Sequence, residues 1–270
     1  MYNADLYRKN NNLQQNLAMA CLEKHESKIT WRESKNRILD IGCGEGTVSI
    51  MLKKYFPNNF TFLGCDINEN MVKLANDKHL DEKVSFTVLD ITGDVPEKMK
   101  GSFSHIFSFF AINWIRDQKS TFKNIYNLME TGGECFLEIV TSTPIFEVYR
   151  SFECNTKWNN WVYDVERYIS PYHDYQDPKK ELMKMMFDIG FHNVDIQDEE
   201  VSYIFEDMEA MKNTLKAVNP FKIPLEKYNE FWNDYFELWK KFEGLDQYGR
   251  DYFANGIEYK FKVLIVHAQK

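Results

Sequence analysis

The sequence lacks the excess of basic residues, the long apolar run and the leader segment that mark several large classes of protein. Its 270 residues include 33 Lys and Arg against 41 Asp and Glu, a formal net charge of -8 at pH 7. Because phosphate polyanions bind to basic surfaces, this balance argues against RNA or DNA as a partner. No apolar run reaches the ~18 residues of a membrane span, and Met1–Asp5 lacks the features of a signal peptide. We therefore expect a cytoplasmic protein that does not cross a membrane.

Cysteines are few and do not occur in pairs. The five of them, at positions 21, 43, 65, 135 and 154, form neither a disulfide framework nor a C-x-x-C motif, so we expect reduced thiols. Cys21 and His25 stand four residues apart on an expected helix, a spacing that can place two metal ligands on one face. Since no second pair of ligands lies nearby, we expect no metal site.

A glycine-rich turn, formed by Gly42, Gly44 and Gly46, lies between a short apolar run and an amphipathic stretch. This order of strand, tight loop and helix brings backbone close to a nucleotide-like ligand, and glycine leaves no Cβ in its way. The spacing G-x-G-x-G differs from that of dinucleotide binders. Asp40 before the turn disfavours a diphosphate but suits the cationic amino-acid group of S-adenosylmethionine. A simple loop is the alternative.

Two further acids end expected strands. Asp66 closes the second apolar run, 26 residues after Asp40, where an acid in doubly wound folds accepts hydrogen bonds from ribose hydroxyls. The alternative is that Asp66 caps the helix that begins near Glu69. Asp90 closes the third run, where it can accept from an adenine amino group while Ile91 packs on the ring. Because parallel strands end at one edge of a sheet, the three acids should converge on one ligand.

The segment Leu39–Gly46 resembles the first motif of class I S-adenosylmethionine-dependent methyltransferases. Asn3–Tyr7 with Leu13–Gln14, Asn113–Gln118 and Pro144–Phe146 are similar to segments of the insect juvenile hormone acid O-methyltransferases, and the resemblance covers most of the chain. The resemblance implies a carboxyl O-methyltransferase that uses S-adenosyl-L-methionine and releases S-adenosyl-L-homocysteine. The expected cofactor contacts are Asp40, Gly42, Cys43, Gly44, Gly46, Asp66, Ile67, Asp90, Ile91 and Ser108.

Strand-like runs alternate with helical stretches, as in a parallel sheet covered by helices. The fold class predicted is α/β: a Rossmann-like, seven-stranded methyltransferase sheet with helices on both faces and a helical, aromatic-rich substrate cap. The resemblance implies an antiparallel seventh strand. The expected strands are Arg37–Leu39, Phe60–Ile67, Val84–Ile91, Phe103–Phe109, Gly132–Val140, one within Phe191–Phe205, and Glu258–His267. Expected helices include Thr121–Met129 and Glu181–Ile189, with Thr131–Gly133 as the break between helix and strand.

Two aromatic-rich regions interrupt this alternation. Residues 144–175 hold nine aromatic residues and 221–253 hold eleven, about twice the chain average of 16%. Their helical spacing gives one wide apolar face, which must be buried: Tyr228, Phe231, Trp232, Tyr235, Trp239 and Phe242. Such aromatics either pack on the core and on each other or roof an apolar pocket, and both can hold. We expect N-terminal helices and a cofactor-binding core at 1–143, a cap insertion at 144–176, core at 177–205, a helical cap at 206–256 and a final core strand at 257–270.

The expected partner is a hydrophobic carboxylic acid. A carboxylate with a pKa near 4–5 is ionised at pH 7, so it accepts a methyl group without a base. The segment after the fourth strand offers Asn113 and Trp114 but no Asp-His or Lys base. The resemblance assigns substrate carboxylate contact to Gln14 and Trp114, the predicted catalytic pair. An amide NH2 and an indole N–H can hold a carboxylate oxygen without removing its charge.

Several alternatives stay open at this level. Trp114 can be a core residue, and either Gln14 or its neighbour Gln15 is expected to face water. Asn113, a predicted substrate contact, stands where a histidine commonly precedes the tryptophan in the resembled family, which leaves a weaker or shifted activity open. The alternative functions are a non-catalytic terpenoid- or cofactor-binding paralogue and a methyltransferase of another small hydrophobic molecule. Methylation of a neutral nucleophile would need a base.

Overall fold

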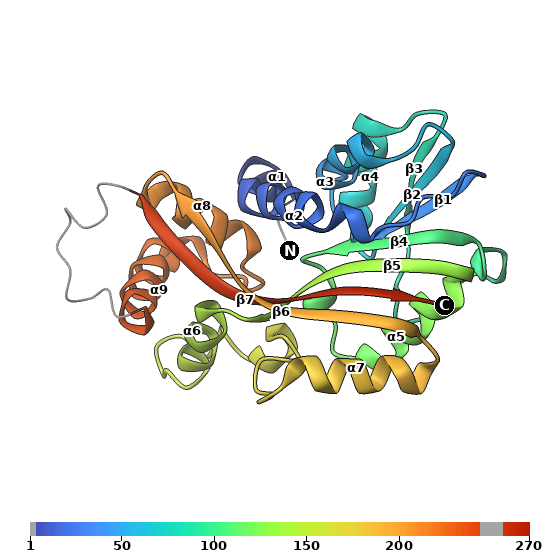
Figure 1. Ribbon diagram of the computed structural model, residues 1–270. Helices are drawn as coiled ribbons and strands as arrows, with labels where there is room; N and C mark the ends of the chain where they lie inside the picture. Colours follow the sequence, from blue (N-terminus) through green and yellow to red (C-terminus); the bar gives the residue numbers. More distant parts are fainter. Residues whose placement is uncertain (1–3, 244–255) are drawn as a thin grey trace.

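A seven-stranded sheet forms the centre of the molecule (Figure 1). The computed structural model describes residues 4–243 and 256–270, so Asn3 and three aromatic residues of the 221–253 region, Tyr248, Tyr252 and Phe253, lie outside the description. The strands are β1 Asn36–Ile41, β2 Phe60–Asp66, β3 Val84–Val88, β4 Phe103–Phe109, β5 Met129–Ser142, β6 His192–Phe205 and β7 Ile257–Gln269. The predicted α/β fold with seven strands is confirmed.

The strand order β3-β2-β1-β4-β5-β7-β6 is that of a doubly wound sheet with a reversed final strand. β1 to β5 pair in parallel, while β7 is antiparallel to both of its neighbours, as expected. The α-helices are α1 Ala4–Lys9, α2 Asn12–His25, α3 Thr47–Leu52, α4 Glu69–His79, α5 Gln118–Leu128, α6 Pro144–Glu153, α7 Pro178–Ile189, α8 Met208–Val218 and α9 Tyr228–Phe242. Short 3-10 helices are η1 Glu26–Lys28, η2 Lys53–Tyr55, η3 Glu97–Met99, η4 Ile112–Trp114, η5 Val165–Tyr168 and η6 Leu225–Lys227.

Two apolar layers cover the sheet, one on each face. The first contains side chains of α2, α3 and α4 packed on sheet residues such as Phe62 and Phe136. The second contains side chains of α5 and α7 packed on residues such as Ile106 and Leu137. Alternation along each buried strand sends neighbouring side chains into opposite layers, which is why the central strands are apolar on both sides.

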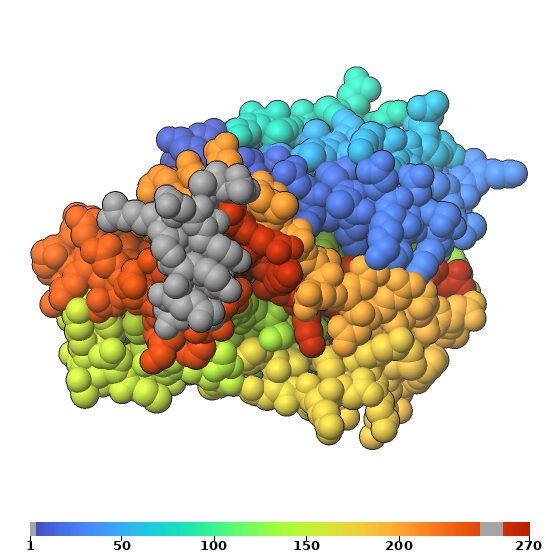
Figure 2. All heavy atoms as spheres, turned by 60° about the vertical axis from the view of Figure 1, so that its left-hand side comes forward, coloured from blue at the N-terminus to red at the C-terminus, as the bar shows by residue number. Residues whose placement is uncertain are grey.

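The cap is built on an extension of β6 and β7. Pairing of β5 with β7 ends at Ser142 and Lys262, whereas β6 and β7 remain paired as far as Phe205 and Ile257. α6, α8 and α9 gather around this two-stranded extension (Figure 1). In the space-filling view the segments of α6, α8 and α9 form one continuous mass beside the N-terminal helices (Figure 2).

The aromatic face expected near residue 235 is buried in the cap. Phe231, Trp232, Tyr235 and Trp239 of α9 are all buried, and the Phe231 ring lies 5.2 Å from that of Phe152 on α6. These rings belong to the same apolar layer as α2 and the adjoining sheet face. Packing of the aromatics on the core and on each other is therefore confirmed for these residues. Phe242 at the end of the helix is 45% exposed, and Tyr228 at its start is half-buried.

The expected break at Thr131–Gly133 is wrong. α5 ends at Leu128 and β5 begins directly at Met129, so the two glycines lie within the strand. They form an irregularity in the pairing with β4, where the register shifts between Phe103 and His105. Gly132 has a positive φ of 70°, and a Cβ on Gly133 would lie 2.9 Å from the Glu130 carbonyl oxygen. Glycine is favoured at positive φ both in a β-bulge and at the end of a helix. A pair of glycines therefore does not distinguish a bulge from a break between helix and strand.

Within residues 4–243 and 256–270, no helix is long and apolar enough to cross a membrane. The same residues hold no cluster of three or more His, Cys, Asp or Glu side chains arranged to bind a metal ion. The five cysteines are all free, and Cys43, Cys65 and Cys135 are buried.

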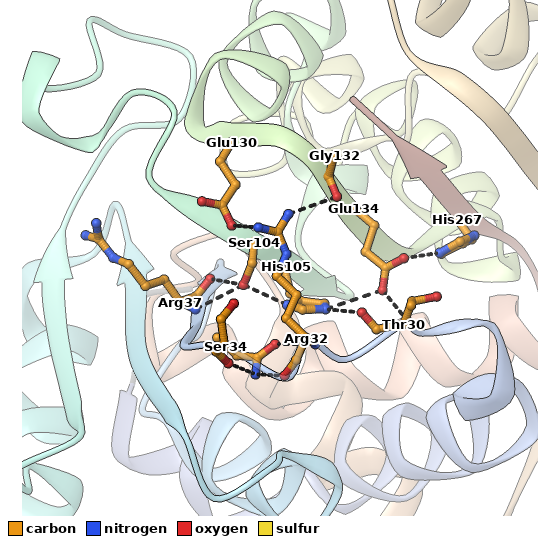
Figure 3. Close-up of polar contacts among 11 residues, drawn as sticks. Thr30, Arg32, Ser34, Arg37, Ser104, His105, Glu130, Gly132, Glu134 and His267 are labelled. Atoms are coloured by element: carbon orange, nitrogen blue, oxygen red, sulfur yellow. Dashed lines mark hydrogen bonds and ion pairs between the residues drawn. The ribbon is translucent and has the colours of Figure 1, made fainter.

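Two buried glutamates on β5 have opposite environments. Glu134 is surrounded by partners (Figure 3): its carboxylate accepts from the Thr30 N–H at 2.7 Å and lies 3.4 Å and 3.1 Å from the Nε2 atoms of His105 and His267. Burial opposes ionisation, but these hydrogen bonds outweigh it and lower the pKa of Glu134 to about 2. Glu138 is 1% exposed, and its Oε2 atom has no hydrogen-bond partner among the described residues. Burial raises the pKa of Glu138 to about 8.

The two glutamates should respond to pH in opposite directions. The folded state holds Glu138 protonated, so the free energy of unfolding falls as pH rises from about 4.5 to about 8. Glu138→Gln removes this cost and should raise the free energy of unfolding at pH 7 by on the order of 2–3 kcal/mol, with no gain near pH 4. Glu134 contributes stability above pH 4.5, so Glu134→Gln should lower the free energy of unfolding at pH 7. Urea unfolding of both variants between pH 4 and 8 measures this, and changes of equal sign would contradict the assignment.

Candidate functional site

The glycine turn between β1 and α3 has the backbone conformation that the sequence predicts. Gly42, Gly44 and Gly46 have φ values of 76°, 56° and 86°, all in the left-handed region. A Cβ on Gly42 would lie 2.1 Å from the Cβ of Ala111, and one on Gly46 would lie 3.0 Å from the Phe86 ring. The loop is therefore pressed against the turn after β4 on one side and against β3 on another.

Asp66 supports this loop. One of its carboxylate oxygens accepts from the Gly44 N–H at 3.0 Å, and the other accepts from the Asn68 N–H at 2.8 Å. Burial raises the pKa of Asp66, against the effect of these two backbone hydrogen bonds. The alternative that Asp66 caps α4 is wrong, because the N-cap is Asn68, whose side chain accepts from the N–H groups of Asn70 and Met71.

Asp40 lies beneath the loop instead of at its surface. The side chain is 3% exposed and accepts a hydrogen bond of 2.5 Å from the Ser49 hydroxyl of α3. Burial raises the pKa of Asp40 to about 7, although the Ser49 hydrogen bond lowers it. Cys43 is buried next to it, and Ser108 is fully buried and donates to the Ile41 carbonyl at 2.8 Å. These side chains therefore hold the loop from below.

The third strand ends earlier than predicted. β3 stops at Val88, and Asp90 lies two residues beyond it, where its carboxylate accepts from the N–H and hydroxyl of Thr92. Ile91 is 5% exposed and packs in the apolar layer of α5, so little of its side chain is open to a ligand, and its contact with a ring stays a prediction. Ile67 after β2 is 68% exposed instead. An apolar residue next to a strand end can point to either side, which the sequence pattern does not resolve.

An apolar pocket adjoins the glycine loop. It contains about 670 Å³ of space not filled by atoms, part of which is open to solvent. Tyr7 of α1 connects the two, because it lines the pocket and is the nearest side chain to the position of a Cβ on Gly44, at 3.9 Å. The walls come from α1, α2, η4, α6, α8 and the cap portion of β7.

Two buried amides line this pocket without partners. Gln14 of α2 is 9% exposed and Asn113 of η4 is 1% exposed. The side-chain oxygen of each is buried and has no hydrogen-bond partner in the described parts of the chain. A buried amide oxygen is normally hydrogen-bonded, so each unpaired oxygen lacks a donor, and turning either amide by 180° would place its NH2 group there instead. Gln15 is half-buried and donates to Asn11, which decides that Gln14 is the pocket residue.

Trp114 lines the pocket but does not offer its N–H. The indole donates to the Phe110 carbonyl at 3.1 Å, so the expectation of a free indole donor is wrong in this conformation. Phe110 has a positive φ of 55°, a strained value for a residue with a side chain, and the indole holds the carbonyl of this turn. The Trp114 ring stands edge-on to Phe146 at 6.3 Å. Trp114 thus shapes the pocket wall and fixes the turn that carries Asn113.

The remaining polar groups of the pocket are hydroxyls. Tyr7, Thr143, Thr214 and Tyr259 join the two amides and Trp114, and the described lining contains no Asp, Glu, His, Lys or Arg. The sequence pattern does not single out Tyr7 as a pocket residue, nor Thr143 and Tyr259, which are 116 residues apart. No local sequence pattern marks such a pair.

Because its described lining is mostly apolar and holds no charged side chain, the pocket is suited to an apolar ligand that carries its own charge.

Comparison with known proteins is consistent with this geometry. Residues 38–133 match the family model described as a methyltransferase domain. The structure is similar to YcgJ of Bacillus subtilis, with a TM-score of 0.60, 13% identity and coverage of 93% of this chain and 98% of the other. It is also similar to phosphoethanolamine N-methyltransferase 2 of Haemonchus contortus, with a TM-score of 0.56, 19% identity and coverage of 94% and 52%. At these identities the likeness establishes the fold.

Curated relatives extend the likeness to the whole chain. Juvenile hormone acid O-methyltransferase of Bombyx mori is 43% identical over 100% of this chain and 98% of its own length. The protein of the same name from Drosophila melanogaster is 34% identical over 88% of this chain and 82% of its length. Malonyl-[acyl-carrier protein] O-methyltransferase 1 of Ilyobacter polytropus is 28% identical over 86% and 79%. The chain therefore belongs to the juvenile hormone acid O-methyltransferase family of S-adenosylmethionine-dependent methyltransferases.

Proposed function

We propose that this enzyme forms the methyl ester of a hydrophobic sesquiterpenoid acid, juvenile hormone acid or farnesoic acid, in juvenile hormone biosynthesis. The observation that carries the proposal is the pair of amide side chains, Gln14 and Asn113, in a mostly apolar pocket whose described lining holds no charged side chain. The substrate named in the two insect relatives, juvenile hormone acid, is a carboxylic acid and fits the same chemistry. The aromatic cap favours a long apolar chain behind the carboxylate.

The residues around the glycine loop fit S-adenosylmethionine. Gly44 leaves its part of the loop open, with no atom nearer than 3.9 Å to its Cβ position, and the Asp66 carboxylate at the end of β2 can accept from ribose hydroxyls. Ile67 offers an exposed apolar side chain for a ring, and Asp90 an exposed acceptor. Burial raises the pKa of Asp40 below the loop to about 7, and a cationic group bound nearby would favour its ionised form. When bound, the cofactor supplies a methyl group on a sulfonium, which is electrophilic without further activation.

Catalysis by this pocket then reduces to binding and orientation. A carboxylate is ionised at pH 7, so no side chain has to remove a proton. The NH2 groups of Gln14 and Asn113 can donate to the carboxylate oxygens and hold the group in a fixed orientation, which is catalysis by proximity. The apolar walls exclude water and strengthen these hydrogen bonds. Methylation of a neutral nucleophile is less well supported, because the described lining contains no acid or histidine to act as a base.

The first prediction concerns the glycine loop. Gly42→Ala would place a Cβ 2.1 Å from the Ala111 Cβ, so the loop must shift and S-adenosylhomocysteine should bind at least tenfold more weakly. Gly101→Ala is the matched control, because Gly101 also has a positive φ, of 61°, but no atom lies within 4 Å of its Cβ position. Calorimetric titration of both variants measures the effect. Equal affinities of the two variants would refute the role of the close approach.

The second prediction concerns the amides. Gln14→Met and Asn113→Leu each remove hydrogen-bond donors to a charged group, so kcat/KM for the acid should fall by about tenfold to a hundredfold. Affinity for S-adenosylhomocysteine should stay unchanged, since neither residue belongs to the glycine loop. Asn12→Leu, at an exposed position of α2, is the control and should behave as the parent enzyme. Unchanged kcat/KM in both pocket variants would remove these residues from the site.

The third prediction concerns the substrate. Purified enzyme incubated with methyl-labelled S-adenosylmethionine and a panel of terpenoid and straight-chain fatty acids should form labelled methyl ester from the terpenoid acids. No ester from any acid, together with calorimetric binding of the same acids, would instead support a non-catalytic binding protein, the alternative that the Asn113 departure raises. No ester and no binding would refute the proposed substrate class.

A further inference from the structure

Four polar side chains of the pocket form two pairs, which are carried by different elements of the fold. Gln14 belongs to α2, and Asn113 to η4, which follows β4. Thr143 follows β5, and Tyr259 belongs to β7. The glycine loop follows β1, and the strand order β1-β4-β5-β7 places the elements carrying the hydroxyls farther from it, at about 4.8 Å per strand. The pocket therefore has a polar position near the loop and a second one farther along the sheet.

The second position consists of two hydroxyls with one hydrogen bond between them. Thr143 Oγ1 and the Tyr259 phenol oxygen are bonded to each other and are 7% and 3% exposed as residues. Each hydroxyl carries one proton, and the bond between them uses only one of the two. Neither side chain has another hydrogen bond among residues 4–243 and 256–270. One O–H donor is thus left without an acceptor in a region lined by Val140, Ile145 and Phe261.

The fold gives no other use for these hydroxyls. Thr143 occupies the N-cap position of α6, but its side chain forms no capping hydrogen bond. The Tyr259 ring packs against Trp239 and Phe261, at 6.5 Å and 5.7 Å, and a phenylalanine would make the same contacts. Burying a hydroxyl donor without an acceptor is unfavourable, so a ligand that supplies the acceptor should be preferred over one that does not.

We propose that the Thr143–Tyr259 pair is a second substrate contact, which binds an acceptor oxygen of the ether, epoxide or carbonyl class on the apolar chain, away from the carboxylate. This subsite rests on the proposed function, because it assumes that the same acid is held by Gln14 and Asn113. It makes the enzyme selective for acids that carry a second oxygen. Such an acid must come from a reaction that oxygenates the chain before the methyl transfer.

The test compares two acids that differ by one acceptor oxygen. Farnesoic acid and its terminal epoxide have the same carbon chain, and the enzyme should show a kcat/KM about tenfold higher for the epoxide. The double variant Thr143→Val with Tyr259→Phe should lose this preference, so that its kcat/KM values for the two acids become equal. Each single variant should keep part of the preference, because the remaining hydroxyl retains its proton.

Tyr203→Phe provides the matched control. Tyr203 is paired with Tyr259 across β6 and β7 but does not line the pocket, so this variant should keep the full preference. Equal kcat/KM values for the two acids in the parent enzyme, or a preference that survives the double substitution, would overturn the subsite while leaving the proposed function intact. If neither acid is methylated, the proposed function fails. Calorimetric Kd values for the two acids with S-adenosylhomocysteine present then decide the subsite, and equal values overturn it.

Discussion

The close approach of Gly42 to Ala111 is the contact on which the rest of the site depends. A side chain on Gly42 would overlap Ala111, so only glycine allows the loop after β1 to lie against the turn after β4. That turn leads into η4, which carries Asn113 and Trp114. Because β1 and β4 are neighbours in the sheet, the loop suited to the cofactor and the amides suited to the acid meet at the same edge. The absence of a Cβ on Gly42 therefore allows the glycine loop and the segment that carries Asn113 to lie next to each other.

The cap completes the site from segments that are far apart in the sequence. The extended β6–β7 pair projects past β5 and brings Tyr259 and Phe261 over the same edge, where α6, α8 and the N-terminal helices supply the other walls. The aromatic side chains of α6 and α9 form the core of this cap and hold it on the sheet. Among the described aromatic residues of 144–175 and 221–253, only Phe146 lines the pocket, so the aromatic excess mainly gives the cap a core of its own.

Features that depend on neighbouring residues in the sequence could be predicted. Features that depend on contacts between distant residues could not. The glycine turn, the acid at the end of β2 and the apolar face of α9 each follow from local sterics or periodicity. The Trp114 N–H donates to the Phe110 carbonyl because the backbone of Phe110 has a positive φ. The sequence does not predict this φ, since phenylalanine rarely adopts it. The side to which Ile91 points depends on where β3 ends, and strand ends are poorly defined by composition. The Thr143–Tyr259 pair arises only when β5 and β7 are brought together.

The central claim is that neutral donors next to the glycine loop hold an ionised carboxylate. A crystal structure of the enzyme with S-adenosylhomocysteine and farnesoic acid tests it most directly. The account predicts that the carboxylate oxygens lie about 2.7–3.2 Å from the side-chain nitrogens of Gln14 and Asn113, with the apolar chain directed into the cap. A carboxylate bound outside this pocket, or held by a charged side chain in place of the two amides, would contradict it.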